Sequence, residues 1–191
     1  MKICKAVAVL AAATGLWASD DPPTSNRVVT VCMNPGANTS MIQRGQGTAS
    51  LVLKQAGIQL NWRSDQRTCT EGNGILVTVS QRTPVHQHPG ALAFALPYDR
   101  ARNNIVLFYD RVLNTASPAV TPALLGYVLA HEIVHMLQGV DLHTESGVMK
   151  ARWEPRDYAE MQRGRMRLSE SDIAQINHSL EWLRLHAARV K

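Results

Sequence analysis

Short apolar runs alternate with longer amphipathic stretches along the chain, and the two patterns predict strands and helices in a mixed order. Five runs rich in β-branched and other apolar residues predict strands, at residues 28–33, 58–63, 75–80, 91–96 and 105–109. The last run, Ile-Val-Leu-Phe-Tyr, is the most continuously apolar, which predicts a central place in the sheet.

Three segments predict helices. Residues 40–56 carry apolar side chains at helical spacing, although two glycines weaken the pattern. Residues 121–138 begin with Thr121 as N-cap and a proline at the first helical position, and they end before Gly139, which suits a left-handed C-cap. A capping-box-like start at residue 169 opens the last helix, whose apolar face comprises Ile173, Ile176, Leu180, Leu183 and Ala187.

The start of the chain has the layout of a secretory signal peptide: Lys2 and Lys5, then an apolar stretch, then small residues. The apolar stretch is too short to span a bilayer. An N-terminal core helix is the less favoured alternative. We therefore expect a signal peptide over residues 1–19, a short polar lead-in over 20–26 and one folded domain over 27–191. The protein would then be secreted or periplasmic, without a membrane span.

Composition narrows the class of protein further. Hydrophobic residues make up 45% of the chain and charged residues 18%, as in a soluble globular domain rather than a disordered or fibrous chain. Twenty Lys and Arg against fifteen Asp and Glu give a net charge of +5, and two of the lysines lie in the expected signal peptide. Nucleic-acid-binding proteins usually show a stronger and more clustered basic signature, so we expect no nucleic-acid partner.

Export would leave two of the three cysteines in the mature chain. Cys4 would leave with the signal peptide, so the mature chain would keep Cys32 and Cys69. An even pair in an oxidising compartment predicts one disulfide, and two free buried thiols are the alternative.

The chemistry of the chain is concentrated in the predicted helix over residues 121–138, which contains the HExxH sequence His131-Glu132-Ile-Val-His135. Residues four apart share one face of a helix, so both imidazoles can reach one metal ion while Glu132 lies beside it. The alternative is two helical histidines that bind no metal. The HExxH sequence lies on a helix with clear end signals in a protein expected to be exported, and this favours the metal site over the alternative.

A catalytic zinc ion usually has three protein ligands and one water molecule, so a third ligand is expected. His143 lies eight residues after His135, just beyond the Gly139 turn, and Asp141 lies six residues after it. We favour His143, because neutral imidazole is the commoner zinc ligand, and keep Asp141 as the alternative.

These residues resemble the metzincin pattern, HExxHxxGxxH followed by a methionine turn, and the stretch is similar to matrixin-like bacterial zinc proteases. His131, Glu132 and His135 match the pattern directly, and Met149 matches the methionine that lies beneath the metal in that family. The resemblance is strong over residues 130–149 and architectural elsewhere.

The chain departs from the family pattern in its spacing. Gly139 follows His135 by four residues rather than three, and His143 follows it by eight rather than six. Asp141 stands at the usual spacing, and some metzincin-like enzymes use Asp at that position. The departure therefore bears on the third ligand more than on the class.

The resemblance implies an α+β, zincin-like fold: a twisted, mostly parallel five-stranded sheet with an antiparallel edge strand, an active-site helix and a C-terminal helix. The segment Ala91, Leu92, Ala93 and Phe94 resembles the edge strand on which such enzymes bind an extended peptide through main-chain hydrogen bonds. Residues 27–191 would be the catalytic domain.

The function implied is a zinc-dependent metalloendopeptidase with one catalytic Zn²⁺ and a peptide or protein substrate. Glu132 would act as general base toward a zinc-activated water molecule. A metzincin-like domain that binds peptide or protein with little or no turnover is the alternative, prompted by the irregular ligand spacing. We expect a monomer.

Three weaker signals have simple explanations. His86 and His88 could bind a second, structural metal, as some matrixins do, but two histidines without nearby carboxylates are more often solvated. Glu160 could be a third ligand of another zinc-protease type, and ranks below both His143 and Asp141. Trp153 and Tyr158 could line a specificity pocket, and core packing explains them equally well.

Overall fold

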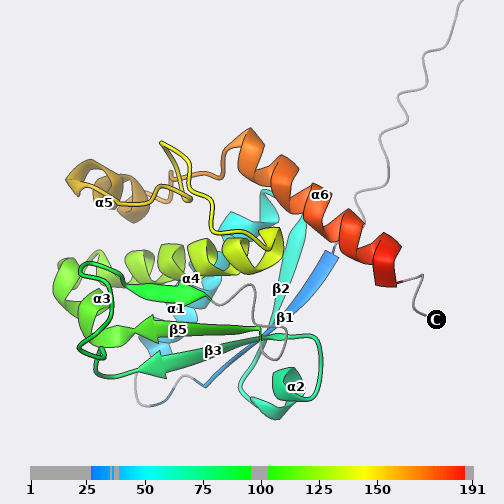
Figure 1. Ribbon diagram of the computed structural model, residues 1–191. Helices are drawn as coiled ribbons and strands as arrows, with labels where there is room; N and C mark the ends of the chain where they lie inside the picture. Colours follow the sequence, from blue (N-terminus) through cyan, green and yellow to red (C-terminus); the bar gives the residue numbers. More distant parts are fainter. Residues whose placement is uncertain (1–26, 35, 37–38, 96–102, 188–191) are drawn as a thin grey trace, which may run out of the picture.

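The computed structural model describes residues 27–34, 36, 39–95 and 103–187 of the chain (Figure 1). The expected signal peptide and lead-in, residues 1–26, lie outside this part.

The strands of the described residues form one sheet in the order β2-β1-β3-β5-β4 (Figure 1). The first four are mutually parallel and β4 pairs antiparallel with β5. This confirms the predicted five-stranded, mostly parallel sheet with an antiparallel edge strand. The strands are β1 (Arg27–Met33), β2 (Ile58–Arg63), β3 (Ile75–Ser80), β4 (Ala93–Ala95) and β5 (Asn104–Phe108).

The sequence-based prediction was wrong in detail for the last two strands. The predicted strand over 91–96 begins only at Ala93, because Gly90 has a positive φ of 86° and the Ala91 N–H turns back to the His88 carbonyl. Ala91 and Leu92 therefore precede the strand, and Leu96 lies outside the described residues. β5 is interior rather than central, since β3 occupies the middle of the sheet.

Helix α4 lies between the sheet and the pair α5 and α6 in Figure 1, and it contacts α1, α3, α5, α6, β4 and β5. None of the described helices is both long and apolar enough to cross a membrane. The helices are α1 (Thr39–Lys54), α2 (Arg67–Thr70), α3 (Tyr109–Thr115), α4 (Thr121–Gln138), α5 (Pro155–Gln162) and α6 (Glu170–Ala187).

The three long helices form where the apolar pattern predicts them, with small differences at their ends. α1 ends at Lys54, before the positive-φ Gly57. α4 begins at Thr121 itself, because the Thr121 hydroxyl donates backward to the Ser117 carbonyl at 2.9 Å and does not cap the helix. The reciprocal bonds between Ser169 and Asp172 confirm the cap of α6.

α4 is buried along almost its whole length, and its contact with α1 is unusually close. A Cβ atom on Gly126 would lie 2.7 Å from the Gly45 carbonyl oxygen and would also collide with Thr48. A Cβ on Gly45 would meet Leu125 at 2.9 Å. Gly45 and Gly126 thus allow the backbones of α1 and α4 to come together, which helps to fix the position of α4 against the sheet.

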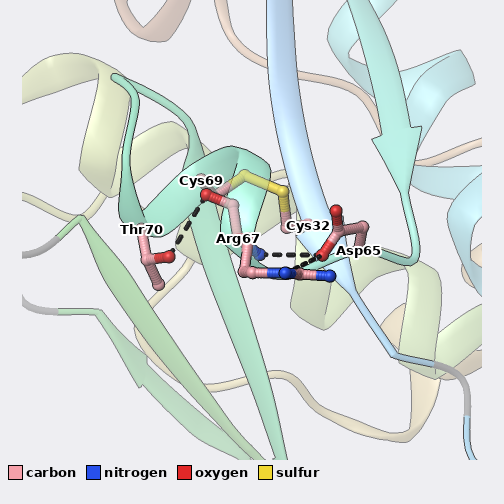
Figure 2. Close-up of a disulfide and its surroundings, with 5 residues drawn as sticks. All are labelled: Cys32, Asp65, Arg67, Cys69 and Thr70. Carbon is pink, nitrogen blue, oxygen red and sulfur yellow. Dashed lines mark hydrogen bonds and ion pairs between the residues drawn. A yellow bond between two sulfur atoms is a disulfide. The ribbon is translucent and has the colours of Figure 1, made fainter.

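Cys32 at the end of β1 and Cys69 in α2 form a disulfide, as predicted (Figure 2). Their Cα atoms are 5.9 Å apart, within the usual range. Gly74 packs against this bond so closely that a Cβ there would collide with the Cys69 sulfur. Beside it, the Asp65 carboxylate pairs with Arg67 at 3.6 Å.

Candidate metal centre

α4 places His131 and His135 one turn apart on one buried face, with 9% and 5% of each residue exposed. Their Nε2 atoms are 3.0 Å apart. Two nitrogens bound to one tetrahedral zinc ion at 2.0–2.1 Å lie about 3.3 Å from each other. Both rings therefore direct an Nε2 atom toward the same point.

Backbone carbonyls fix the orientation of both rings. The Nδ1 of His131 lies 2.8 Å from the Val148 carbonyl oxygen, and the Nδ1 of His135 lies 3.1 Å from that of Val140. A carbonyl only accepts, so each Nδ1 carries the hydrogen and each Nε2 keeps its lone pair. This tautomer is the one that binds a metal through Nε2.

His143 comes from the loop after α4, which turns at the left-handed Gly139 (φ 66°). Its ring centre lies 5.2 Å from that of His131 and 4.9 Å from that of His135. One donor atom from each of the three histidines lies within 4.8 Å of the others. The structure thus brings together the three histidines that the sequence singled out as ligands.

Asp141 lies beside this group and is not part of it. Its Oδ1 is 3.8 Å from the His135 Nε2 and 4.0 Å from the His143 Nδ1, and 75% of its side chain is exposed. The three-histidine set found among the described residues does not include it. The geometry therefore favours His143 over Asp141 as the third donor.

The pKa values of the buried groups suit metal binding. Burial and the neighbouring His135 and His143 lower the pKa of His131 to about 3, against the opposing effect of its hydrogen bond to Val148. Burial also lowers the pKa of His135. At neutral pH both imidazoles are uncharged, as ligands must be.

Glu132 is buried beside the histidines, with 8% of the residue exposed. Burial, and then the charge of Asp141, raise its pKa to about 8, while a hydrogen bond from the Ala95 backbone acts in the opposite direction. A divalent cation at the histidines would favour the ionised carboxylate by direct attraction. Burial and a bound cation would thus shift the pKa of Glu132 in opposite directions.

The turn that contains Met149 helps to orient His131 through the Val148 carbonyl. Gly147 has a φ of 78°, and a Cβ there would collide with the Arg167 carbonyl. That same carbonyl accepts the Val148 N–H at 3.0 Å, which fixes the Val148 carbonyl on His131. Met149 itself is fully buried.

A cleft of about 670 Å³ opens over the three histidines. All four residues expected to form the substrate strand line it, as does Ala95. The remaining lining residues include Glu132, Val128, His88, Pro89, Gly90, Lys150, Arg152, Trp153 and Tyr158.

Alternate backbone groups of β4 point away from β5 and toward this cleft. The Leu92 carbonyl accepts the Phe108 N–H at 2.9 Å, and Phe94 lies opposite Val106. By antiparallel alternation, Ala93 and Ala95 therefore carry the outward groups. The Ala95 amide accordingly reaches Glu132.

The weaker predicted sites do not join the centre. Glu160 accepts a hydrogen bond from Arg163 at 3.0 Å, and His88 Nδ1 lies 2.9 Å from the Pro89 carbonyl oxygen. Neither they nor His86 belongs to the metal-binding group of the described residues. Trp153 does lie at the site, with its ring centre 5.5 Å from that of His131.

No family model matches the chain, and no curated protein matches it. The function must therefore be inferred from the residues of the site.

Proposed function

We propose that this chain is an exported zinc metalloendopeptidase of metzincin type. The observation that carries the proposal is the convergence of three imidazoles on one point, next to a buried carboxylate and along the open edge of a sheet. His131, His135 and His143 would hold the ion. Three imidazole nitrogens, two of them on rings oriented by backbone carbonyls, form a donor set typical of a catalytic zinc site.

Zinc, when bound, polarises a carbonyl group and lowers the pKa of a coordinated water molecule toward neutrality. Glu132 accepts a proton from the water molecule whose oxygen bonds to the scissile carbon. As the bond between carbon and nitrogen breaks, Glu132 gives that proton to the leaving amine. The Ala95 backbone favours the ionised form of Glu132, which is the form that accepts the proton.

The peptide would bind as an additional strand beside β4. The N–H and C=O of Ala93 point away from β5, so they can pair with the backbone of an extended substrate. Such pairing selects an extended chain rather than a particular side chain, in keeping with endopeptidase activity. The disulfide between Cys32 and Cys69 supports export to an oxidising compartment.

The proposal is tested by zinc content together with cleavage of fluorescently labelled casein, with and without a zinc chelator. We expect Glu132→Gln to retain zinc and to lower kcat by about 10²–10⁴, the usual contribution of a general base. Glu160→Gln, on α5, is the matched control and should keep full activity. Casein cleavage by zinc-loaded Glu132→Gln at the wild-type rate would contradict the proposal. Zinc without cleavage in the wild type would instead favour a peptide-binding domain.

A further inference from the structure

One side of the cleft is formed by a segment without regular secondary structure. We call residues 81–92, which connect β3 to β4, the rim segment. Its last five residues, 88–92, line the same cleft as the histidines. A peptide that lies along β4 must therefore pass the rim segment at the beginning of the strand.

Two adjacent side chains of α3 hold the rim segment. The Thr83 N–H and hydroxyl donate to the carboxylate of Asp110, at 3.0 and 2.7 Å. The Nη1 of Arg111 donates to the carbonyls of His88 and Ala91, at 2.7 and 2.8 Å.

The Arg111 guanidinium has the geometry of a clamp. Its Nη2 also reaches the Gln87 carbonyl at 3.5 Å, and its central carbon lies 5.4 Å from the centre of the Phe108 ring. The two shorter bonds join carbonyls on either side of the positive-φ Gly90. A planar group with several fixed donors can hold these carbonyls together, whereas a lysine ammonium offers only a point charge.

The clamp ends where the substrate edge begins. Leu92, the residue after the clamped Ala91, makes the bond to Phe108 that starts the pairing of β4 with β5. Among the described residues, His86 and His88 belong to no group of metal-binding side chains that could hold the rim segment in place of Arg111. Side-chain contacts from α3 thus set the shape of the rim segment.

We infer that Arg111 is a positioning residue for the peptide substrate: by clamping residues 87–91, it fixes the rim segment and the start of β4 before an extended peptide binds. This inference rests on the proposed function. Without the clamp, a peptide would have to order this backbone as it binds. Fixing the backbone of about one residue corresponds to roughly a tenfold loss of affinity.

The test compares Arg111→Gln and Arg111→Lys with Arg163→Gln, which removes an exposed arginine at the C-terminal end of α5. Amide hydrogen exchange should become faster at residues 87–93 in Arg111→Gln, with zinc content and melting temperature unchanged. KM for labelled casein should rise roughly tenfold while kcat stays within twofold. Arg111→Lys should restore part of the loss, and Arg163→Gln should resemble the wild type.

Binding of labelled casein to the zinc-loaded Glu132→Gln protein, by fluorescence anisotropy, separates this inference from the proposed function because it needs no turnover. Adding Arg111→Gln should raise Kd roughly tenfold. An unchanged or lower Kd, or unchanged exchange at residues 87–93, would overturn the role of Arg111. A wild type that binds casein without cleaving it would overturn only the proposed function.

Discussion

The two sides of the cleft are held by different kinds of contact. The floor, which comprises α4 and residues 140–150, is fixed by close helix packing at Gly126 and by backbone carbonyls on His131 and His135. The rim segment is fixed by polar side chains of Asp110 and Arg111 near the surface. The candidate metal ligands therefore depend on the core, while the proposed substrate edge depends on a few hydrogen bonds. Substitutions in the floor should change folding and metal binding, and substitutions in the rim should change the local order of the rim segment and the binding of the proposed substrate.

The largest effect is expected for Gly126→Ala in the floor. The added Cβ would lie 2.7 Å from the Gly45 carbonyl oxygen, and neither backbone can move without separating α1 from α4. We expect a loss of about 3 kcal/mol in the free energy of unfolding, measured by urea denaturation. Gly47→Ala is the matched control, because nothing lies within 4 Å of its Cβ and alanine favours a helix by about 0.5–1 kcal/mol. Equal stabilities of the two variants would contradict the close packing.

A second effect separates the two candidate third ligands, at the most exposed part of the floor. His143→Ala should weaken zinc binding by more than the roughly 10- to 100-fold that loss of an outer-shell partner costs. Asp141→Asn should weaken zinc binding less than about tenfold, since the carboxylate of Asp141 lies outside the three-histidine group. Competition with a chromophoric chelator gives both affinities. A greater loss in Asp141→Asn than in His143→Ala would assign the third position to Asp141.

The smallest effect is a local response of the rim segment to acid. Hydrogen bonds from the Thr83 backbone and side chain hold the pKa of Asp110 below its ordinary value of 3.8. Their contribution to stability is therefore complete above that pH and is lost as the pH falls through the lowered pKa. The Thr83 amide resonance should stay constant from pH 7 to 5 and shift only below about pH 4. In Asp110→Asn the Thr83 amide resonance should not change with pH over this range. A titration midpoint above pH 4 in the wild type would argue against the hydrogen bonds between Thr83 and Asp110.

The sequence predicted the parts of the molecule in which periodic burial dominates. Five apolar runs and three long helical patterns correspond to the sheet and to α1, α4 and α6. The short helices α2, α3 and α5 were missed, because four to eight largely polar residues carry too little periodic signal. Tyr109 was assigned to the preceding strand, although it is the first residue of α3, because an apolar residue at the end of a strand can equally begin a helix.

The candidate site shows the same division. The spacing of His131, Glu132 and His135 predicted their common face, because helix geometry alone determines it. The carbonyls of Val140 and Val148 were not predictable, since any residue supplies a carbonyl and only the fold places it. Arg111 was missed because the carbonyls that it binds lie at least 20 residues away and a lone arginine ordinarily suggests a solvated surface.

The disulfide between Cys32 and Cys69 limits the damage that a protease could do to the chain. Cys32 and Cys69 are 37 residues apart, and the segment between them contains α1 and β2. A single peptide-bond cut anywhere between the two cysteines leaves one covalently continuous molecule, with both fragments joined through sulfur. Helix α1, which packs against α4, would therefore stay attached after such a cut. Reduction would be needed before such a cut could release α1 from the part of the chain that contains α4.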